Sequence, residues 1–396
     1  MKKIVLVLAV LLVSVSACKN PFLKKMLVEE EKGKTVPEKP HAPFIEGGAS
    51  LILSPDKLDI TVEVRTADST PITVEGCTET TLPSGAQTVL HATSTRVILK
   101  GKIIVLNCSY NQLTALNVQG LTTLYSLSCY GNQLTELNVQ GLTALQTLEC
   151  SYNQLTELNV QGLTALKYLF CYSNQLTALD VQGLTALERL YCGNNQLTTL
   201  NVQGLTALKE LYCYNNQLTA LNVQGCTALQ ELRCYNNQLT ALNAQGLTAL
   251  KVLYCYSNQL TALNMQGLTA LKELYCYNNQ LTALNVQGCT ALKGLSCGYN
   301  QLTTLNVQGL TALRTLRCYN NKLTAQAFTK LFDDLPARQD SDNGECILYT
   351  EESGVTEGNH TDFSTPEALK TAFLNAKNNK KWKMYKWNGS WPGVEI

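Results

Sequence analysis

Histidine is scarce in this sequence, and neither sign of charge is in excess. Only 3 of the 396 residues are histidines, and 31 lysines and arginines face 30 aspartates and glutamates. The histidines lie far apart, at His41, His91 and His360, which argues against a clustered metal or acid–base site. A net charge of +1 gives no electrostatic basis for binding nucleic acid. We therefore expect no catalytic residues, no cofactor, no metal and no nucleic-acid partner.

The sequence also lacks an apolar run long enough to span a bilayer, which takes about 20 residues. It begins with a basic Met-Lys-Lys, continues with an apolar stretch from Ile4 to Val15 and reaches small residues before Cys18. These features predict a signal peptide over residues 1–17. The Val-Ser-Ala-Cys end resembles the lipobox of bacterial lipoproteins, and this resemblance implies that Cys18 carries the lipid. An ordinary secretory signal, with Cys18 merely beside the cleavage site, is the alternative.

Residues 18–46 are charged, contain prolines and are poor in aromatics, so we expect a solvated, flexible tether. A lipid and a flexible tether hold a soluble domain at a membrane surface without inserting it. The protein is therefore expected to be exported and lipid-anchored to the bacterial envelope, at the outer membrane or cell surface. The lipid is its only expected contact with the membrane, and we expect a monomer.

Cysteine recurs at a fixed spacing through the middle of the chain. Eleven cysteines lie 21 residues apart: Cys108, Cys129, Cys150, Cys171, Cys192, Cys213, Cys234, Cys255, Cys276, Cys297 and Cys318. The residues around them repeat as well, with the skeleton LxxLxCxxNQLTxLNVQGLTA. One such unit cannot bury its own leucines, whereas stacked copies can, so the period indicates a solenoid.

This skeleton resembles the leucine-rich repeat family in its 21-residue bacterial form, LxxLxCxxNxLxxLNVxGLTx, with cysteine where a third leucine is usual. The match covers residues 103–323 and is similar to the repeats of bacterial surface lipoproteins and internalin-like adhesins. The resemblance implies a curved solenoid that is used for binding and not for catalysis. The expected fold is a leucine-rich repeat solenoid of the α/β class, mostly β. It has a parallel sheet on the concave face, a thin extended second face, a β-rich N-terminal cap and an α/β C-terminal cap.

The residues of the unit around Cys213 support the same architecture. Leu211 and Cys213 are predicted to face the core and Tyr212 the solvent, because successive side chains of a strand alternate. Copies stacked about 4.8 Å apart form a parallel sheet. Asn216 closes the strand, where a buried amide binds loop backbone, so we interpret it and its equivalents as structural. Residues 218–223 repeat the pattern and predict a second extended segment with little room for a helix.

The 16 cysteines first suggest disulfides or zinc, but their spacing argues against both. In register, neighbouring Cβ atoms lie about 4.8 Å apart, beyond the range of about 3.5–4.5 Å for a disulfide. The sequence has no Cys-x-x-Cys and no Cys/His cluster that suits zinc. Cys226 and Cys289 stand where most copies have leucine, which predicts free, buried thiols. The pattern does not place Cys77 and Cys346.

Both ends of the array depart from the repeat. Residues 47–102 alternate like strands and predict a β-rich cap over the first coil; an independent binding module is the alternative. Residues 324–396 combine helical and strand patterns and predict an α/β cap that continues the sheet. Residues 382–387 are expected to be the closing strand. Lysines near it are interpreted as a guard against edge pairing, with binding of nucleic acid or an anionic surface as the alternative.

Function is expected on the exposed side chains of the main sheet, where the middle repeats gather aromatic residues and arginine, the residue types that dominate binding hot spots. The predicted ligand-binding residues are Tyr168, Phe170, Tyr172, Arg189, Tyr191, Glu210, Tyr212, Tyr214, Arg233, Tyr235, Tyr254, Tyr256, Tyr275 and Tyr277. A self-stabilising ladder of tyrosines is the alternative. We expect a non-enzymatic module for protein interaction or adhesion, with an extracellular protein or a host or cell-surface ligand as partner. A glycan-binding module and a structural envelope spacer are the alternatives.

Overall fold

The computed structural model describes residues 41–390 and 393–396. The predicted signal peptide, Cys18 and most of the predicted tether lie outside the described residues. The end of the predicted tether is not flexible, because Ala42 is buried and its carbonyl accepts the Asn117 Nδ2 at 3.0 Å. Residues Ala42–Ile396 form one compact unit, which is described here by itself. In the part of the chain that the structure describes, no helix has the length and apolar character needed to cross a membrane.

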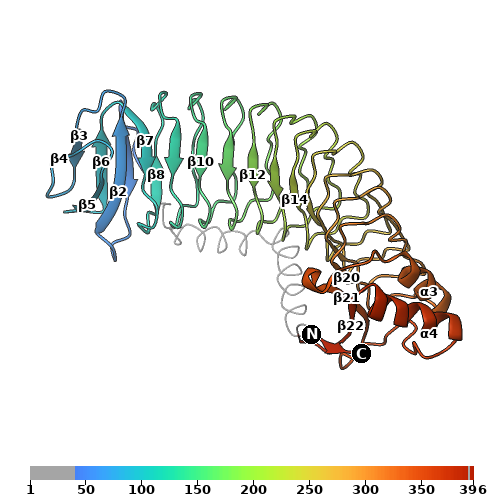
Figure 1. The fold of residues 1–396 in the computed structure, drawn as a ribbon. Coiled ribbons are helices and arrows are strands. Elements are labelled where there is room, and N and C mark those ends of the chain that lie inside the picture. The colour runs from blue at the N-terminus through green and yellow to red at the C-terminus, as the bar shows by residue number, and fades with distance from the viewer. Residues whose placement is uncertain (1–40, 391–392) are drawn as a thin grey trace, which may run out of the picture. The chain divides into compact units, whose positions relative to one another are not determined.

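The repeats build one long parallel sheet, as the alternation predicts (Figure 1). Its first solenoid strand is β7 (Ile103–Asn107), and the later coils contribute three residues each. These short strands are β9 (Ser126–Ser128), β10 (Thr147–Glu149), β11 (Tyr168–Phe170), β12 (Arg189–Tyr191), β13 (Glu210–Tyr212), β14 (Glu231–Arg233), β15 (Val252–Tyr254), β17 (Glu273–Tyr275), β19 (Gly294–Ser296) and β20 (Thr315–Arg317). Each leucine pairs with the leucine of the next coil, for example Leu211 with Leu232. The register therefore stacks every sequence column directly above its copies.

Each coil contributes leucines and one cysteine to a continuous core. Leu211 and Cys213 are fully buried, and so are their equivalents in the other coils. Burying one leucine side chain contributes about 1.5–3 kcal/mol, which only the stacking of neighbouring coils supplies here. The predicted inward and outward positions of the repeat are confirmed.

Asn216 shows how each coil satisfies its turn. Its Nδ2 donates to the carbonyl oxygens of Cys192 and Cys213, both at 3.1 Å, and its Oδ1 accepts the Leu197 N–H at 2.9 Å. Its Nδ2 also lies 3.2 Å from the Tyr214 carbonyl oxygen, so one amide joins two coils through four backbone groups. The same pattern recurs along the array, which confirms the structural interpretation of this asparagine column.

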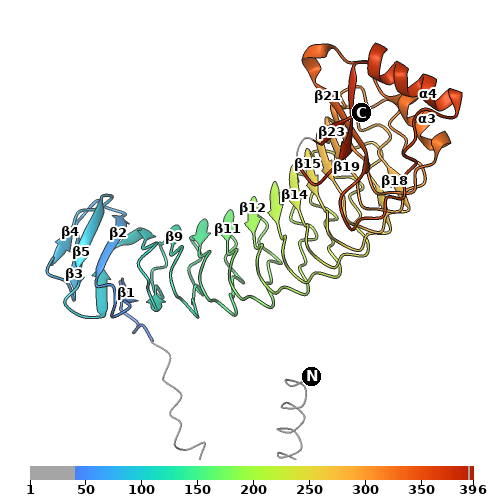
Figure 2. The ribbon, with the colours of Figure 1, turned by 90° about the horizontal axis from the view of Figure 1, so that it is seen from below.

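The second face of the solenoid is extended, as predicted, but few of its segments pair as regular strands. Two of its segments, β16 (Ala262–Asn264) and β18 (Ala283–Asn285), form a two-stranded parallel sheet, and isolated bridges join Asn117 to Asn138 and Asn201 to Asn222. Figure 2 shows the strands of the long sheet along the inner side of the curve and the thin turns along the outer side. Coils that curve toward the sheet are farther apart on the outer side, which explains the sparse pairing there. No helix occurs between residues 103 and 323.

The N-terminal cap is β-rich, as predicted, and covers both faces of the first coil. Its strands are β1 (Gly48–Ile52), β2 (Asp59–Thr66), β3 (Ile72–Glu75), β4 (Thr81–Leu82), β5 (Gln87–His91) and β6 (Arg96–Lys100). Strand β2 pairs antiparallel with β7 and so extends the main sheet, while β1 pairs antiparallel with β8 (Ala115–Asn117) on the second face. The first coil therefore has partners for its backbone on both sides.

The C-terminal cap continues the sheet with helices on its other face, as predicted. After α3 (Ala325–Asp334) and a short 3₁₀ turn (Asp340–Asp342), β21 (Gly344–Thr350) pairs parallel with β20. After α4 (Glu367–Leu374) and a π-helical turn (Asn375–Asn379), β22 (Trp382–Trp387) pairs parallel with β21. The expectation that residues 382–387 close the sheet is wrong, because β23 (Val394–Glu395) pairs antiparallel with β22. The two residues of β23 are too few to leave a periodic signal in the sequence.

The fifteen cysteines of the described residues are free thiols, and all except Cys77 are buried. Burial raises the pKa of the Cys213 thiol well above its usual range. The Sγ of Cys226 donates to the Val202 carbonyl at 3.1 Å, and the Sγ of Cys289 does the same to Met265. Cys346, which the repeat pattern does not place, lies fully buried in β21 opposite Leu316. It therefore extends the core of the array into the C-terminal cap.

Candidate binding surface

The outward residue between the core leucine and cysteine forms a continuous column in the middle repeats. We call Phe170, Tyr191, Tyr212, Arg233, Tyr254 and Tyr275 the first ladder. The rings of Tyr191 and Tyr212 stack with centroids 4.1 Å apart and an interplanar angle of 3°, and those of Tyr254 and Tyr275 stack at 4.5 Å. Arg233 fills the gap between them, with its Cζ 4.6 Å from the Tyr212 centroid and 5.3 Å from that of Tyr254. A cation thus continues the stack of aromatic rings.

The residue after each cysteine forms a second ladder, made of Tyr214, Tyr235, Tyr256 and Tyr277. Successive centroids lie 4.7, 4.4 and 4.4 Å apart, with interplanar angles of 5°, 9° and 8°. The ladder begins at Tyr214, whose ring lies over Gly193: a Cβ at that glycine would come within 2.9 Å of the ring Cζ. The in-register strands set this spacing, because each ring stands one strand from the next.

Carboxylates beside the first ladder bind three of its polar groups. The Tyr191 hydroxyl donates to Glu210 and the Tyr254 hydroxyl donates to Glu273. Arg233 pairs with Glu231, with its Nε 2.6 Å from Oε1. These contacts hold the side chains in one arrangement before any partner arrives.

The environment of the ladders also affects the titration of the phenols. Burial, followed by the nearby Glu231 carboxylate, raises the pKa of Tyr212 to about 12. Burial, followed by the neighbouring Tyr277, raises the pKa of Tyr256 to about 12. The ladder phenols are therefore neutral at physiological pH.

The stacking decides which part of each ring a partner can reach. Parallel rings about 4–5 Å apart cover one another's faces and leave ring edges and hydroxyls toward solvent. A sugar ring stacks on an aromatic face, and inside the ladders those faces are occupied. The ladders therefore offer rows of hydroxyl-tipped edges interrupted by one guanidinium, which suits protein side chains and backbone.

The structure groups most of the predicted site residues on this surface and sets one apart. Tyr168 stacks on Phe170 at 6.5 Å, and the Arg189 Cζ lies 5.6 Å from the Tyr168 centroid, so both adjoin the first ladder. Tyr172 does not continue the second ladder, because Gly193 interrupts the column. It instead meets Tyr152 edge to face, with centroids 5.3 Å apart and an angle of 83°.

Tyr172 belongs to a group that the sequence analysis does not identify. We call Tyr110, Tyr130, Tyr152 and Tyr172 the tyrosine cluster. Its rings meet at steep angles: Tyr110 and Tyr130 lie 4.9 Å apart at 64°, and Tyr130 and Tyr152 lie 5.1 Å apart at 59°. Tyr110 is 66% exposed and Tyr152 is 50% exposed. The repeat pattern does not reveal this cluster, because its tyrosines come from two different repeat positions. Tyr130 and Tyr172 directly follow the cysteine of their repeat, whereas Tyr110 and Tyr152 lie two residues after it.

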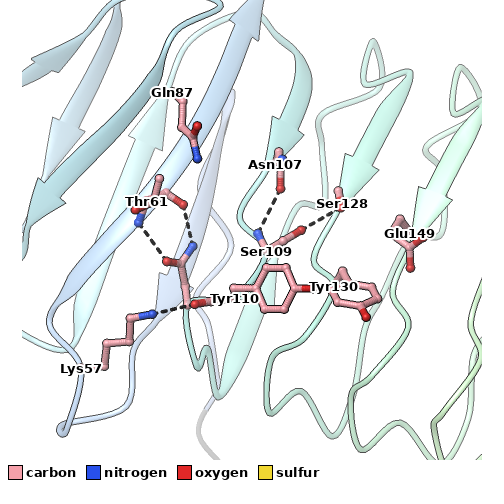
Figure 3. A pocket seen from close by; sticks show the side chains of 10 residues that line it. Lys57, Thr61, Gln87, Asn107, Ser109, Tyr110, Ser128, Tyr130 and Glu149 are labelled. Atoms are coloured by element: carbon pink, nitrogen blue, oxygen red, sulfur yellow. Dashed lines mark hydrogen bonds between the residues drawn. The ribbon is translucent and has the colours of Figure 1, made fainter.

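Beside the tyrosine cluster, a pocket of about 600 Å³ opens between the N-terminal cap and the first coils; we call it the cap pocket (Figure 3). Its polar lining includes Lys57 and Gln87 from the cap and Asn107, Ser109, Ser128 and Glu149 from the coils. Figure 3 shows the rings of Tyr110 and Tyr130 side by side along one rim. The small residues of the outer repeats were the one feature of the sequence that pointed to this pocket. Among them, Asn107 and Ser128 occupy the repeat position at which the first ladder carries aromatic rings.

Comparison with known proteins agrees with the repeat geometry. A family model described as "Leucine Rich repeats (2 copies)" matches residues 164–206, 185–225 and 206–248. The repeats of this chain are leucine-rich repeats. The leucine-rich repeat sheet carries both ladders and one wall of the cap pocket. Among curated proteins, none matches the sequence significantly.

Two solved leucine-rich repeat structures share this fold, and a third aligns with much of the chain. An internalin (InlF) from Listeria monocytogenes is 22% identical over 68% of this chain and 87% of its own, with a TM-score of 0.51. A chain from the octameric complex of Latrophilin 3, Unc5D and FLRT2, the last represented by its leucine-rich repeats, is 21% identical over 72% of this chain and 90% of its own, with a TM-score of 0.51. The functional domain of InlJ from Listeria monocytogenes, described as including a cysteine ladder, is 24% identical over 75% of this chain and 76% of its own, with a TM-score of 0.38.

Within the described residues, no group of three or more His, Cys, Asp or Glu side chains is placed to hold a metal.

Proposed function

We propose that this chain is a non-enzymatic binding module that holds a protein partner against its first and second ladders. A leucine-rich repeat fold supports a protein–protein interaction module in general. The observation that carries the proposal is the pair of ladders, which concentrates tyrosines and a half-exposed arginine on one face of the sheet. Tyrosine and arginine are enriched among the residues that dominate binding energy.

The ladders are suited to binding because their side chains are already ordered. Immobilising a flexible side chain on association costs about 0.5–1.5 kcal/mol. Here stacking and the contacts to Glu210, Glu231 and Glu273 fix the rings and Arg233 in the free protein. A partner therefore gains contact area with little further loss of side-chain entropy.

The place of action rests on the N-terminal sequence. A lipid on Cys18 and a tether over residues 18–46 would hold the monomeric module on the envelope, at the outer membrane or cell surface, where an extracellular or host protein is its partner. Adhesion is the role that this arrangement supports. Protease treatment of intact cells tests it: degradation of the module places it outside the cell, whereas protection places it in the periplasm and contradicts adhesion.

The binding surface is tested by replacing Tyr212, Tyr254 and Tyr275 with serine in one variant. Gln203, Gln245 and Gln308, which are exposed on the other side of the coils, are replaced with serine in the matched control. Binding of the purified chains to immobilised host and bacterial surface proteins is then measured. We expect the tyrosine variant to bind at least about tenfold more weakly and the control to bind normally.

The competing role, a structural envelope spacer, is favoured by one observation: the hydroxyls of Tyr191 and Tyr254 and the guanidinium of Arg233 already have partners within the chain. A spacer loses stability when the tyrosines are removed but loses no binding. Thermal unfolding of both variants, measured beside the binding assay, separates the two roles. Equal binding by the wild type and the tyrosine variant to every protein tested contradicts the proposal and leaves the spacer.

A further inference from the structure

We propose that the cap pocket is a second, separate binding site, which takes a neutral saccharide unit. It lies at the N-terminal end of the array, coils away from the centre of the ladders, and none of its lining residues belongs to either ladder. Its volume of about 600 Å³ falls within the range of about 300–1,000 Å³ that is typical of small-molecule sites. The site does not depend on the proposed function of the ladders.

The recess exists because the first coils carry small side chains where the middle coils carry rings. Asn107 and Ser128 occupy the column that holds Tyr191 and Tyr212 farther along, so the sheet surface is lower there. Beyond β7 the sheet continues into β2 of the cap, and Lys57, Thr61 and Gln87 of the cap line that side of the recess. The small side chains of the first coils and the residues of the cap therefore form one pocket together.

The recess is lined by groups that hydrogen-bond to hydroxyls. The Ser109 and Ser128 hydroxyls lie 2.8 Å apart and share one hydrogen bond, which leaves each with capacity for another partner. Asn107 accepts the Ser109 N–H through Oδ1 at 3.1 Å, and Gln87 is exposed at the cap side. Amides and hydroxyls both donate and accept, as the hydroxyls of a sugar ring require.

The tyrosine cluster supplies aromatic faces that the ladders do not. Tyr110 and Tyr130 meet at 64°, so their faces are not covered by parallel stacking. One side of the Tyr110 ring lies over Gly131, where a Cβ would come within 2.9 Å of the ring Cδ1. Because the side chain is 66% exposed, the remainder of the ring is open beside the pocket. The apolar C–H face of a sugar packs on such a surface.

The charges of the pocket favour a neutral ligand. Lys57 and Glu149 contribute one cation and one anion, so the lining carries no net charge. The Lys57 Nζ is held by the Tyr110 carbonyl at 2.6 Å, and the Glu149 carboxylate accepts the Ser151 N–H at 3.1 Å. Each charged group thus has one partner within the chain, and most of the other polar side chains of the lining are uncharged amides and hydroxyls.

The test fills the pocket with a residue that the fold already accommodates. Ser128→Tyr places in the recess the side chain that the same column carries at Tyr191, so the coil is expected to fold. Thr315→Tyr introduces the same residue on the last repeat strand, far from the pocket, and is the matched control. The whole chain and both variants are titrated with short neutral oligosaccharides of glucose, galactose, mannose and N-acetylglucosamine, by ligand-observed NMR and calorimetry.

We expect at least one of these saccharides to bind the wild type, with little change between low and high salt. Ser128→Tyr should weaken this binding at least about tenfold, which corresponds to losing one or two hydrogen bonds, and Gln87→Ala should weaken it about threefold. Thr315→Tyr and the ladder variant that lacks Tyr212, Tyr254 and Tyr275 should bind as the wild type does. The ladder variant thereby separates a failure of the ladder proposal from a failure of this one.

Three results would overturn the proposal. The first is that no saccharide in the panel binds the wild type. The second is that Ser128→Tyr binds as well as the wild type while its thermal unfolding is unchanged. The third is a salt-sensitive preference for peptides rich in lysine and arginine over every saccharide, which would assign the pocket to Glu149 and a cationic ligand.

Discussion

The ring of Tyr214 rests on Gly193, one coil away, in space that any larger residue would fill. This glycine ends the second ladder and separates it from the tyrosine cluster. The first prediction follows from that contact. In Gly193→Ala the new Cβ would lie 2.9 Å from the Tyr214 Cζ, so the ring must move. We expect the free energy of unfolding to fall by about 1–2 kcal/mol, as for other overpacked sites.

The matched control for Gly193→Ala is Gly294→Ala in β19. Like Gly193, this glycine has no left-handed backbone, but the nearest atom to its added Cβ, the Tyr275 Cε1, is 3.8 Å away. We expect a change within about 0.5 kcal/mol there. Urea unfolding of both variants measures the difference, and equal stabilities would show that Tyr214 moves without cost.

The second prediction concerns Asn216, which binds four backbone groups of two coils. Asn216→Ala leaves the Leu197 N–H buried without this partner, at a cost of about 1–3 kcal/mol, whereas the Cys192 and Cys213 carbonyls keep the hydrogen bonds that Asn195 and Asn237 donate. We expect a loss of about 1–3 kcal/mol in total. The adjacent Gln217 is exposed, and Gln217→Ala should be nearly neutral. Similar unfolding midpoints for the two variants would contradict a structural role for the asparagine column.

The third prediction is an alkaline limit of stability. The pKa of Tyr212 and that of Tyr256 are raised from 10 to about 12, mainly by burial. Between these values the unfolded chain loses phenol protons that the folded chain keeps, so stability falls as the pH rises from about 10 to about 12. Below pH 10 this contribution is fully present.

Melting temperatures measured across this pH range test the third prediction, together with tyrosinate absorbance. Tyr256→Phe removes one titrating group and keeps the ring in the ladder. We expect its melting temperature to fall less steeply with pH than that of the wild type. Parallel curves for the two proteins would show that the ladder phenols titrate as they do in the unfolded chain.

The fourth prediction concerns the thiols. Burial raises the pKa of Cys213 and of its equivalents, and access to the core is closed, so the folded chain should react very slowly with a thiol reagent at neutral pH. Cys77 is the half-buried exception, and burial raises its pKa to about 11. After denaturation without a reductant, all fifteen thiols of the described residues should react. A count below about twelve would indicate disulfides in the isolated protein.

The repeated part of the fold follows from the sequence because its contacts are local and identical from coil to coil. The alternation around Leu211 and Cys213 predicts the strand, and the period of 21 residues predicts the register. The second face escapes the same reasoning: residues 262–264 and 283–285 pair as strands, while most equivalent segments do not. Their spacing depends on the curvature of the whole array, which no single repeat encodes.

The surface shows the same division between local and long-range information. The two ladders are readable as columns, because register places Tyr212 beside Tyr191 and Tyr235 beside Tyr214. The cap pocket is not readable in this way. It requires Asn111 to bind the backbone of Thr61, 50 residues earlier, and so to fix the cap against the first coil. Contacts of that range leave no period in the sequence.

The pairing of β2 with β7 and of β20 with β21 joins each cap to a terminal coil, and the C-terminal cap also reaches the preceding coil, where the Tyr299 hydroxyl donates to Glu352 at 2.6 Å. Every coil between them has neighbours of nearly the same sequence. A gene that loses or gains 63 bases therefore encodes an array that is one coil shorter or longer, with the contacts between neighbouring coils preserved. Unequal recombination within the repeats would then adjust the length of the ladders in single steps. The cap pocket, built from the cap and the first three coils, would be inherited unchanged.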